Sequence, residues 1–256
     1  MFKQIKFFFA FLFVSLLFVS SCSEDNSTSN NPPPANQSYF PTTVGSFWKY
    51  YEYEIDSLGV KVPNSDDTVT TQVVANMSIQ GKNAAVFVST QSKSQTIDTS
   101  FYAYENNKVY SFLSLFNNEF IPIKDANQWV VVADFNQSDW IILKDTTLAN
   151  VDLPDVGTMI PTVGIRGRKG NTTTLVVKGK SVSAQEFIIT FSLKVKLQIP
   201  NVPLPINLNF DVIQHTWYAQ GIGIVKSRLD PFKVGAVFFE QNFNGNQSEL
   251  IDYQIK

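Results

Sequence analysis

Two side chains with distinctive chemistry occur only once in this chain, the thiol of Cys22 and the imidazole of His215. A thiol can be acylated, oxidised or bound to a metal, and an imidazole can move protons or hold a metal ion. With one of each, the chain can form neither an internal disulfide nor a site with two histidine ligands. Each residue must therefore act alone or with carboxylates and hydroxyls.

The setting of Cys22 indicates its role. Two lysines precede an apolar run over residues 7–19, and two serines then lead into the cysteine. This order is that of a secretory signal, and the run is shorter than the roughly 20 residues that a transmembrane helix needs. The sequence VSSC at residues 19–22 resembles a bacterial lipobox. The alternative is a plain secretory signal that is cut elsewhere, with Cys22 as a bystander.

The lipobox resemblance implies that residues 1–21 are a signal peptide, cut off before Cys22. It also implies that the cysteine carries two acyl chains on sulfur, palmitate among them, and that the new amino terminus can be acylated too. Two or more chains anchor a protein stably in a membrane. The sequence SEDN at residues 23–26 resembles the surface-export signal of Bacteroidota lipoproteins; its other interpretation is the solvated start of a linker. We therefore expect an outer-membrane lipoprotein of the cell envelope, with the outer face as one location.

The segment that follows is predicted to be a tether. Residues 22–38 are polar and proline-rich, with no apolar residue larger than proline after the lipidated cysteine, so they cannot bury a core. The sixteen residues 23–38 reach about 50 Å when extended. Residues 39–256 show neither a sequence repeat nor a second linker, which favours a single domain.

Composition and motifs argue against several functions. Removing the signal peptide takes away Lys3 and Lys6 and leaves 18 basic against 22 acidic residues, so nothing indicates a nucleic-acid partner. No Gly-x-Ser-x-Gly or His-Glu-x-x-His motif occurs. Asp134 and Asp145 have the spacing of a calcium loop, but Asp139 stands where the loop needs glycine. We expect a protein that is not an enzyme and uses no cofactor or metal; the sequence leaves its oligomeric state open.

The domain itself has the pattern of β-structure. Residues 189–199 alternate strictly between apolar and polar side chains, and a proline-containing turn leads to a second alternating run at 207–212. Eleven residues of strand span about 36 Å, nearly twice the usual length. We therefore expect a mainly β domain with little helix: a single antiparallel, strongly curved sheet, a half-barrel or open barrel with long hairpins. Further strands are predicted at 69–79, 84–90, 96–104, 109–115, 129–135, 140–143, 174–180, 217–229, 234–243 and 248–255, with a two-residue hairpin turn at Asn244-Gly245.

Two motifs carry a further resemblance. The sequence YFPTTVGSFWKY at residues 39–50 and the sequence WYAQGIGIVK at residues 217–226 are similar to the TapB-like and LolB/LppX-like lipoproteins. These are curved-sheet proteins that are largely uncharacterised. The resemblance implies a concave apolar sheet face that holds a lipid or another hydrophobic ligand. In physical terms, Trp48 and Tyr50 share one face of a strand and can close one end of the sheet.

The leading functional hypothesis is a lipid-anchored, non-catalytic protein that binds a lipid or acyl chain on its concave face. The alternative is a surface-exposed module that binds a glycan or a partner protein through an aromatic strip or a sheet edge. A local basic cluster is a solvated face or a contact for lipid headgroups or acidic sugars; it comprises Arg166, Arg168, Lys169, Lys178 and Lys180. The predicted ligand-binding residues are Ile189, Phe191, Leu193, Val195, Leu208, Phe210, Val212, and Gly221 and Gly223, where bare backbone permits a bend or close approach.

Overall fold

The computed structural model describes residues 38–114, 127–148, 150–153, 157–200, 202, 204–236 and 239–256. The predicted signal peptide, Cys22 and the tether up to residue 37 lie outside this part of the chain. Within it there are fifteen strands and no helix. The strands are β1 (Phe47–Ile55), β2 (Asp67–Ile79), β3 (Lys82–Gln91), β4 (Ile97–Glu105), β5 (Lys108–Ser114), β6 (Asn127–Asp134), β7 (Asp139–Thr147), β8 (Val151–Leu153), β9 (Gly157–Val177), β10 (Lys180–Gln198), β11 (Ile206–Ala219), β12 (Gly223–Leu229), β13 (Phe232–Ala236), β14 (Phe239–Phe243) and β15 (Gly245–Gln254).

Thirteen of these strands form one antiparallel sheet in the order β6-β5-β4-β3-β2-β1-β15-β12-β11-β10-β9-β7, with β8 beside β9. Most neighbours are consecutive in the chain, as expected for hairpins. The exceptions are at one edge, where β7 pairs with β9, and in the middle, where β1 lies beside β15 and β15 then joins β12. The sheet therefore contains two meanders that are held together by β1, β15 and β12.

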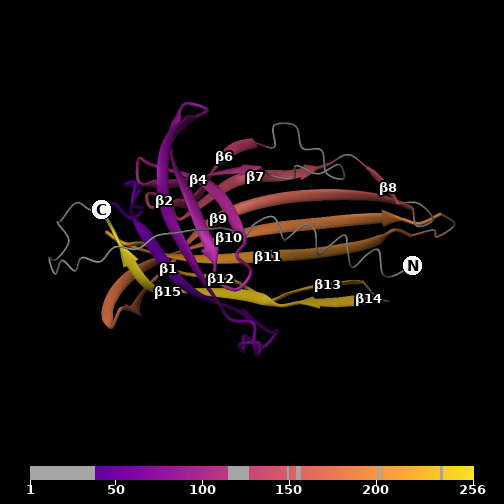
Figure 1. Cartoon of the computed structure of the whole chain (residues 1–256). Helices are drawn as coiled ribbons and strands as arrows, with labels where there is room; N and C mark the ends of the chain where they lie inside the picture. Colours follow the sequence, from indigo (N-terminus) through magenta and orange to yellow (C-terminus); the bar gives the residue numbers. More distant parts are fainter. Residues whose placement is uncertain are drawn as a thin grey trace.

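The two edges of the sheet come together, so that it curves into a nearly closed barrel (Figure 1). The indole Nε1–H of Trp140 on β7 donates to the carbonyl of Val131 on β6 over 2.8 Å. The backbone N–H of Lys169 donates to Ser138 at 2.7 Å, and the Lys169 ammonium reaches the Phe135 carbonyl at 3.1 Å. The expected strongly curved antiparallel sheet is confirmed.

Aromatic side chains fill the barrel. Trp48, Phe87, Phe187 and Tyr218 are each no more than 4% exposed, and Phe40 enters from the segment that precedes β1. Phe40 lies 5.3 Å from the rings of Phe87 and Tyr102 and 6.2 Å from that of Tyr218, centroid to centroid. The segment Ser38–Pro41, which we call the plug, therefore closes one end of the barrel.

The long strands do more than close the barrel. β9, β10 and β11 continue beyond it as a projecting arm, formed by residues 157–166, 190–198 and 206–213 (Figure 1). A second core lies in the arm, built from Met159, Val163, Ile165 and residues of β10 and β11. The sequence did not show whether the predicted hairpin projects or closes the sheet; residues 190–198 and 207–212 lie in the arm, so the hairpin projects.

Three local predictions were wrong. The predicted strand 217–229 is interrupted by a turn, because Gly221 adopts a φ of +76° and the N–H of Ile222 donates to Ala219 at 3.1 Å. The predicted strand 234–243 is a separate hairpin, β13–β14. The predicted hairpin at Asn244-Gly245 is absent, because β14 and β15 belong to different sheets. Gly245 is needed for another reason: an added Cβ would lie 2.7 Å from the Pro231 nitrogen and closer still to the Leu229 carbonyl.

Candidate functional site

The apolar residues predicted to bind a ligand do share one face of the arm. Strand register places Leu193 opposite Phe210 and Val195 opposite Leu208, and the same face of β9 carries Val163 and other apolar side chains. The sequence therefore identified the members of this face correctly. What it did not show is how exposed they are.

Much of this face is covered. Leu193, Val195, Phe210 and Val212 are between 5% and 9% exposed, whereas Ile189, Phe191 and Leu208 are half-buried. The β13–β14 hairpin packs on it: Phe232 stacks 6.1 Å from Phe210 and 4.8 Å from Phe243, and Val234 is 1% exposed. A second, two-stranded sheet thus lies over the β11 side of the predicted ligand face.

Gly221 and Gly223 lie at the other end of the molecule, Gly221 in the turn between β11 and β12 and Gly223 at the start of β12. Both have positive φ, +76° and +99°, which explains the need for glycine. The Gly221 N–H donates to the Ser38 carbonyl at 2.9 Å, and the indole of Trp48 donates to Ile222 at 2.5 Å. These glycines hold the plug and are not brought together with the apolar residues of the arm.

The single histidine lies among charged groups on the face of the sheet that points away from the barrel core. The Nδ1 of His215 is 2.8 Å from the carboxylate of Glu186, and its Nε2 is 3.2 Å from that of Asp230. Arg228 donates to the other oxygen of Asp230 at 2.7 Å, and the ring of Trp217 stacks on the imidazole at 5.8 Å. β11 has neighbours on both sides here, so His215 does not lie at an edge of the sheet.

These residues continue into a strip that crosses β12, β15 and β1. Lys226 lies over Trp217 at 5.6 Å and pairs with Glu249 at 3.2 Å. Gln247 donates to Glu249 and to the hydroxyl of Tyr53, both at 2.6 Å. The alternative hypothesis expected an aromatic strip or a sheet edge. This strip mixes aromatic with charged side chains, and its charges are largely paired with one another.

The other sequence candidates do not form sites. Asp134 is 1% exposed and pairs with Lys108 at 2.7 Å, while Asp145 binds Arg166 and Lys194 on the arm. The predicted basic cluster is spread out as well, since Lys178 pairs with Asp252 at the plug end. Among the described residues, no group of histidine and carboxylate side chains has the arrangement of a metal site. In the same residues, no helix is long and apolar enough to cross a membrane.

A polar hollow opens at the end of β1 that lies away from the plug. It has a volume of about 320 Å³, near the lower limit for small-molecule sites. It is formed by the loop between β1 and β2, the turn after β3 and the start of β15. The sequence does not reveal it, because its residues are far apart in the chain. Its lining residues are Glu52, Tyr53, Glu54, Asn64, Ser65, Asp66, Asp67, Gln91, Lys93 and Asn246.

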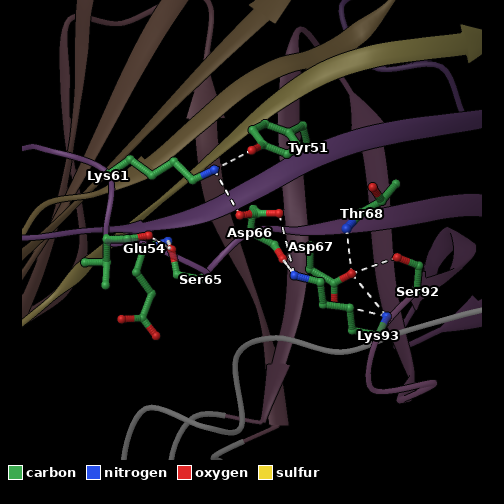
Figure 2. Close-up of polar contacts among 10 residues, drawn as sticks. Tyr51, Glu54, Lys61, Ser65, Asp66, Asp67, Thr68, Ser92 and Lys93 are labelled. Carbon is green, nitrogen blue, oxygen red and sulfur yellow. Dashed lines mark hydrogen bonds and ion pairs between the residues drawn. The ribbon is translucent and has the colours of Figure 1, made fainter.

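Hydrogen bonds hold the wall of this hollow in place. One oxygen of Asp67 accepts from Thr68 N–H at 2.6 Å, from the Ser92 hydroxyl at 2.7 Å and from Lys93 N–H at 3.1 Å. Figure 2 shows Lys61 between Tyr51, at 2.5 Å, and Asp66, at 3.0 Å. Four contacts, from Thr68, Ser92, Lys93 and Lys61, therefore fix the positions of both aspartates, and Tyr51 holds Lys61 in place.

Glu52 differs from the other carboxyls of the hollow. It is half-buried on the inner face of the sheet, and loss of solvation raises its pKa above the ordinary value. A hydrogen bond from Ser248 lowers the pKa by a smaller amount, and the charge of Asp67 raises it further. This carboxyl is therefore more readily protonated than a solvated glutamate and can then donate as well as accept a hydrogen bond.

Comparisons with known proteins give only distant similarities. No family model matches the sequence, and no curated protein matches it significantly. A protein from Parabacteroides distasonis ATCC 8503, described as a "putative lipoprotein", is 11% identical with a TM-score of 0.44, and the match covers 85% of this chain and 99% of that one. A "putative exported protein with YmcC-like fold" from Bacteroides fragilis NCTC 9343 is 12% identical with a TM-score of 0.39, covering 86% and 100%.

Proposed function

We propose that this protein is a lipid-anchored, non-catalytic binding module of the bacterial cell envelope, which presents the polar hollow and the arm away from the membrane. The lipobox of the sequence supplies the anchor at Cys22. The tether that starts there joins the folded domain at Ser38, in the plug.

The observation that carries the proposal is the separation of the plug from the hollow. β1 begins at Phe47, beside the plug, and its nine residues end at Ile55, beside the hollow. At about 3.3 Å per residue, the two ends of this strand are about 30 Å apart. The arm extends in the same direction, because β11 runs from the arm towards Ala219 at the plug.

The covering of the arm favours a polar ligand over a hydrophobic one. The barrel is filled with aromatic rings, and the β13–β14 hairpin packs on the apolar face of the arm. A lipid or acyl chain remains the second candidate because Ile189, Phe191 and Leu208 are only half-buried. Binding of such a ligand requires the β13–β14 hairpin to move off the apolar face of the arm. Native mass spectrometry with lipid extraction would then find a stoichiometric lipid on the purified chain.

Single-cysteine labelling tests the orientation, because the only native cysteine is the predicted lipid site. A fluorophore on Leu58→Cys would report on the hollow end, where Leu58 is 85% exposed. A fluorophore on Val44→Cys, at a residue 46% exposed beside the plug, is the matched control. In vesicles that contain quencher lipids, we expect strong quenching at position 44 and weak quenching at 58. Equal quenching would contradict the proposed orientation.

Binding is tested separately. The mature lipidated chain, incubated with envelope polysaccharide and with envelope proteins from the same cells, should be retained by one of them. Retention by neither, together with a stoichiometric co-purifying lipid, would replace the proposal by the second candidate.

A further inference from the structure

We propose that the polar hollow is a binding site for a neutral saccharide unit. This inference rests on the proposed function and identifies both the site and the chemical class of its ligand. It is carried by the composition of the lining and by the way its groups are fixed.

The lining offers both kinds of hydrogen-bonding group close together. Four carboxyls provide acceptors, the amides of Asn64, Gln91 and Asn246 provide both donors and acceptors, and Lys93 provides donors. A sugar hydroxyl donates one hydrogen bond and accepts others, so a sugar ring needs this mixture. A lipid chain needs an apolar lining, which the hollow does not provide.

Several of the charges at the hollow are already compensated. Asp66 pairs with Lys61 at 3.0 Å and with Lys93 at 3.6 Å, and one oxygen of Asp67 is occupied by three donors. The raised pKa of Glu52 reduces its tendency to carry a charge. The remaining negative charge repels phosphates, sulfates and uronic acids, which leaves neutral sugars as the class that the hollow accommodates.

The position of the hollow fits a chain of sugars as well as a single unit. It is open at the surface, where Lys93 and the residues around it are exposed, and it is bordered by loops rather than by a closed cavity. Glu54 receives a hydrogen bond from Asn244 at 2.8 Å, so the strand end beyond the hollow is fixed too. A preformed polar wall of this kind binds a ligand with little loss of side-chain conformational entropy.

Titration of the mature lipidated chain in detergent with neutral hexoses and N-acetylhexosamines tests the inference, with calorimetry as the readout. Gln91→Ala removes an amide from the lining and should weaken binding about tenfold. Glu54→Gln replaces a charged acceptor by a neutral one and should weaken it about fivefold. Glu240→Gln, the same change at a residue of β14 that pairs with Lys233, is the control and should bind as the unchanged chain does.

Two outcomes overturn the inference. One is binding of spermidine or Ca²⁺ in place of sugars, abolished by Glu54→Gln, which would make the hollow a cation site. The other is retention of envelope polysaccharide with equal affinity in the unchanged chain and in Gln91→Ala. In that second case the proposed binding module stands and its site lies elsewhere, whereas failure to retain any envelope component removes the module itself.

Discussion

Phe40 is expected to be the residue on which the closed end of the barrel most depends. Its side chain is 4% exposed and lies within 6.2 Å of three other rings, although it belongs to the short plug and not to a strand. Truncating a buried phenylalanine to alanine costs about 3–5 kcal/mol when the cavity does not collapse. The plug lies at the start of the domain and can partly detach, so we expect about 3 kcal/mol for Phe40→Ala.

Equilibrium unfolding in urea, followed by tryptophan fluorescence, measures this loss on the chain from residue 23 onward. Trp48 lies in the same core and reports on it directly. The slope of the free energy of unfolding against urea concentration should not change, because the variant alters stability and not the surface exposed on unfolding. Phe40→Leu keeps most of the volume and should cost about 1–1.5 kcal/mol.

The control is Leu58→Ala, at a side chain that is 85% exposed, where the change in the free energy of unfolding should stay within about 0.5 kcal/mol. A loss below about 1 kcal/mol for Phe40→Ala would show that the plug is an appendage and not part of the core. The inferred direction of the tether would then lose its structural basis.

Four further outcomes follow from other parts of the molecule. Gly245→Ala should destabilise the domain by about 1–3 kcal/mol in urea unfolding, because its Cβ would collide with the backbone at Leu229 and Pro231. Phe232→Ala should uncover the apolar face of the arm and increase the fluorescence of an added hydrophobic dye; unchanged fluorescence would mean that the β13–β14 hairpin is not what covers it. Asp134→Asn leaves the ammonium of Lys108 without its partner and should cost about 1–3 kcal/mol, measured by thermal unfolding. Glu52→Gln should raise the stability of the fold at neutral pH and leave it unchanged at low pH. The pKa of Glu52 is higher in the folded than in the unfolded chain, so the native protein becomes less stable as the pH rises above the pKa of the unfolded chain, and the variant does not. A variant whose stability changes equally at both pH values would contradict this.

The fold class could be predicted from the sequence because apolar and polar residues alternate along the strands, and because most strands pair with their neighbours in the chain. The alternation from Ile189 to Ile199 depends only on which face of a strand is buried, and that is a local property. Single turns were harder to predict from the sequence. Lys178 and Gly179 form a two-residue turn with φ of +51° and +74°, but the apolar residues on both sides run on without an obvious break.

The predictions that failed concern contacts between distant segments. Asn244-Gly245 has the composition of a hairpin turn, yet β15 pairs with β1 and β12, and no local pattern encodes those partners. Likewise, the alternation of β10 and β11 identified the apolar face of the arm, whereas its cover by β13 and β14 depends on where Pro231 ends the β12 ladder. The hollow was missed for the same reason, since Glu52, Gln91 and Asn246 meet only after the sheet has curved.

The pairing of β1 with β15 also has a consequence for how the chain folds. Nine residues of β1 bond to β15, which comes far later in the chain, so β1 gains this second neighbour only after residues 245–254 have been made. For a chain that emerges amino terminus first, the open edge of β1 stays available to other strands throughout that time. Folding that depends on so distant a contact is slow. The unpaired edge of β1 is therefore the part of the folding chain most exposed to aggregation, and a holding chaperone should act on the chain until residues 245–254 have been made.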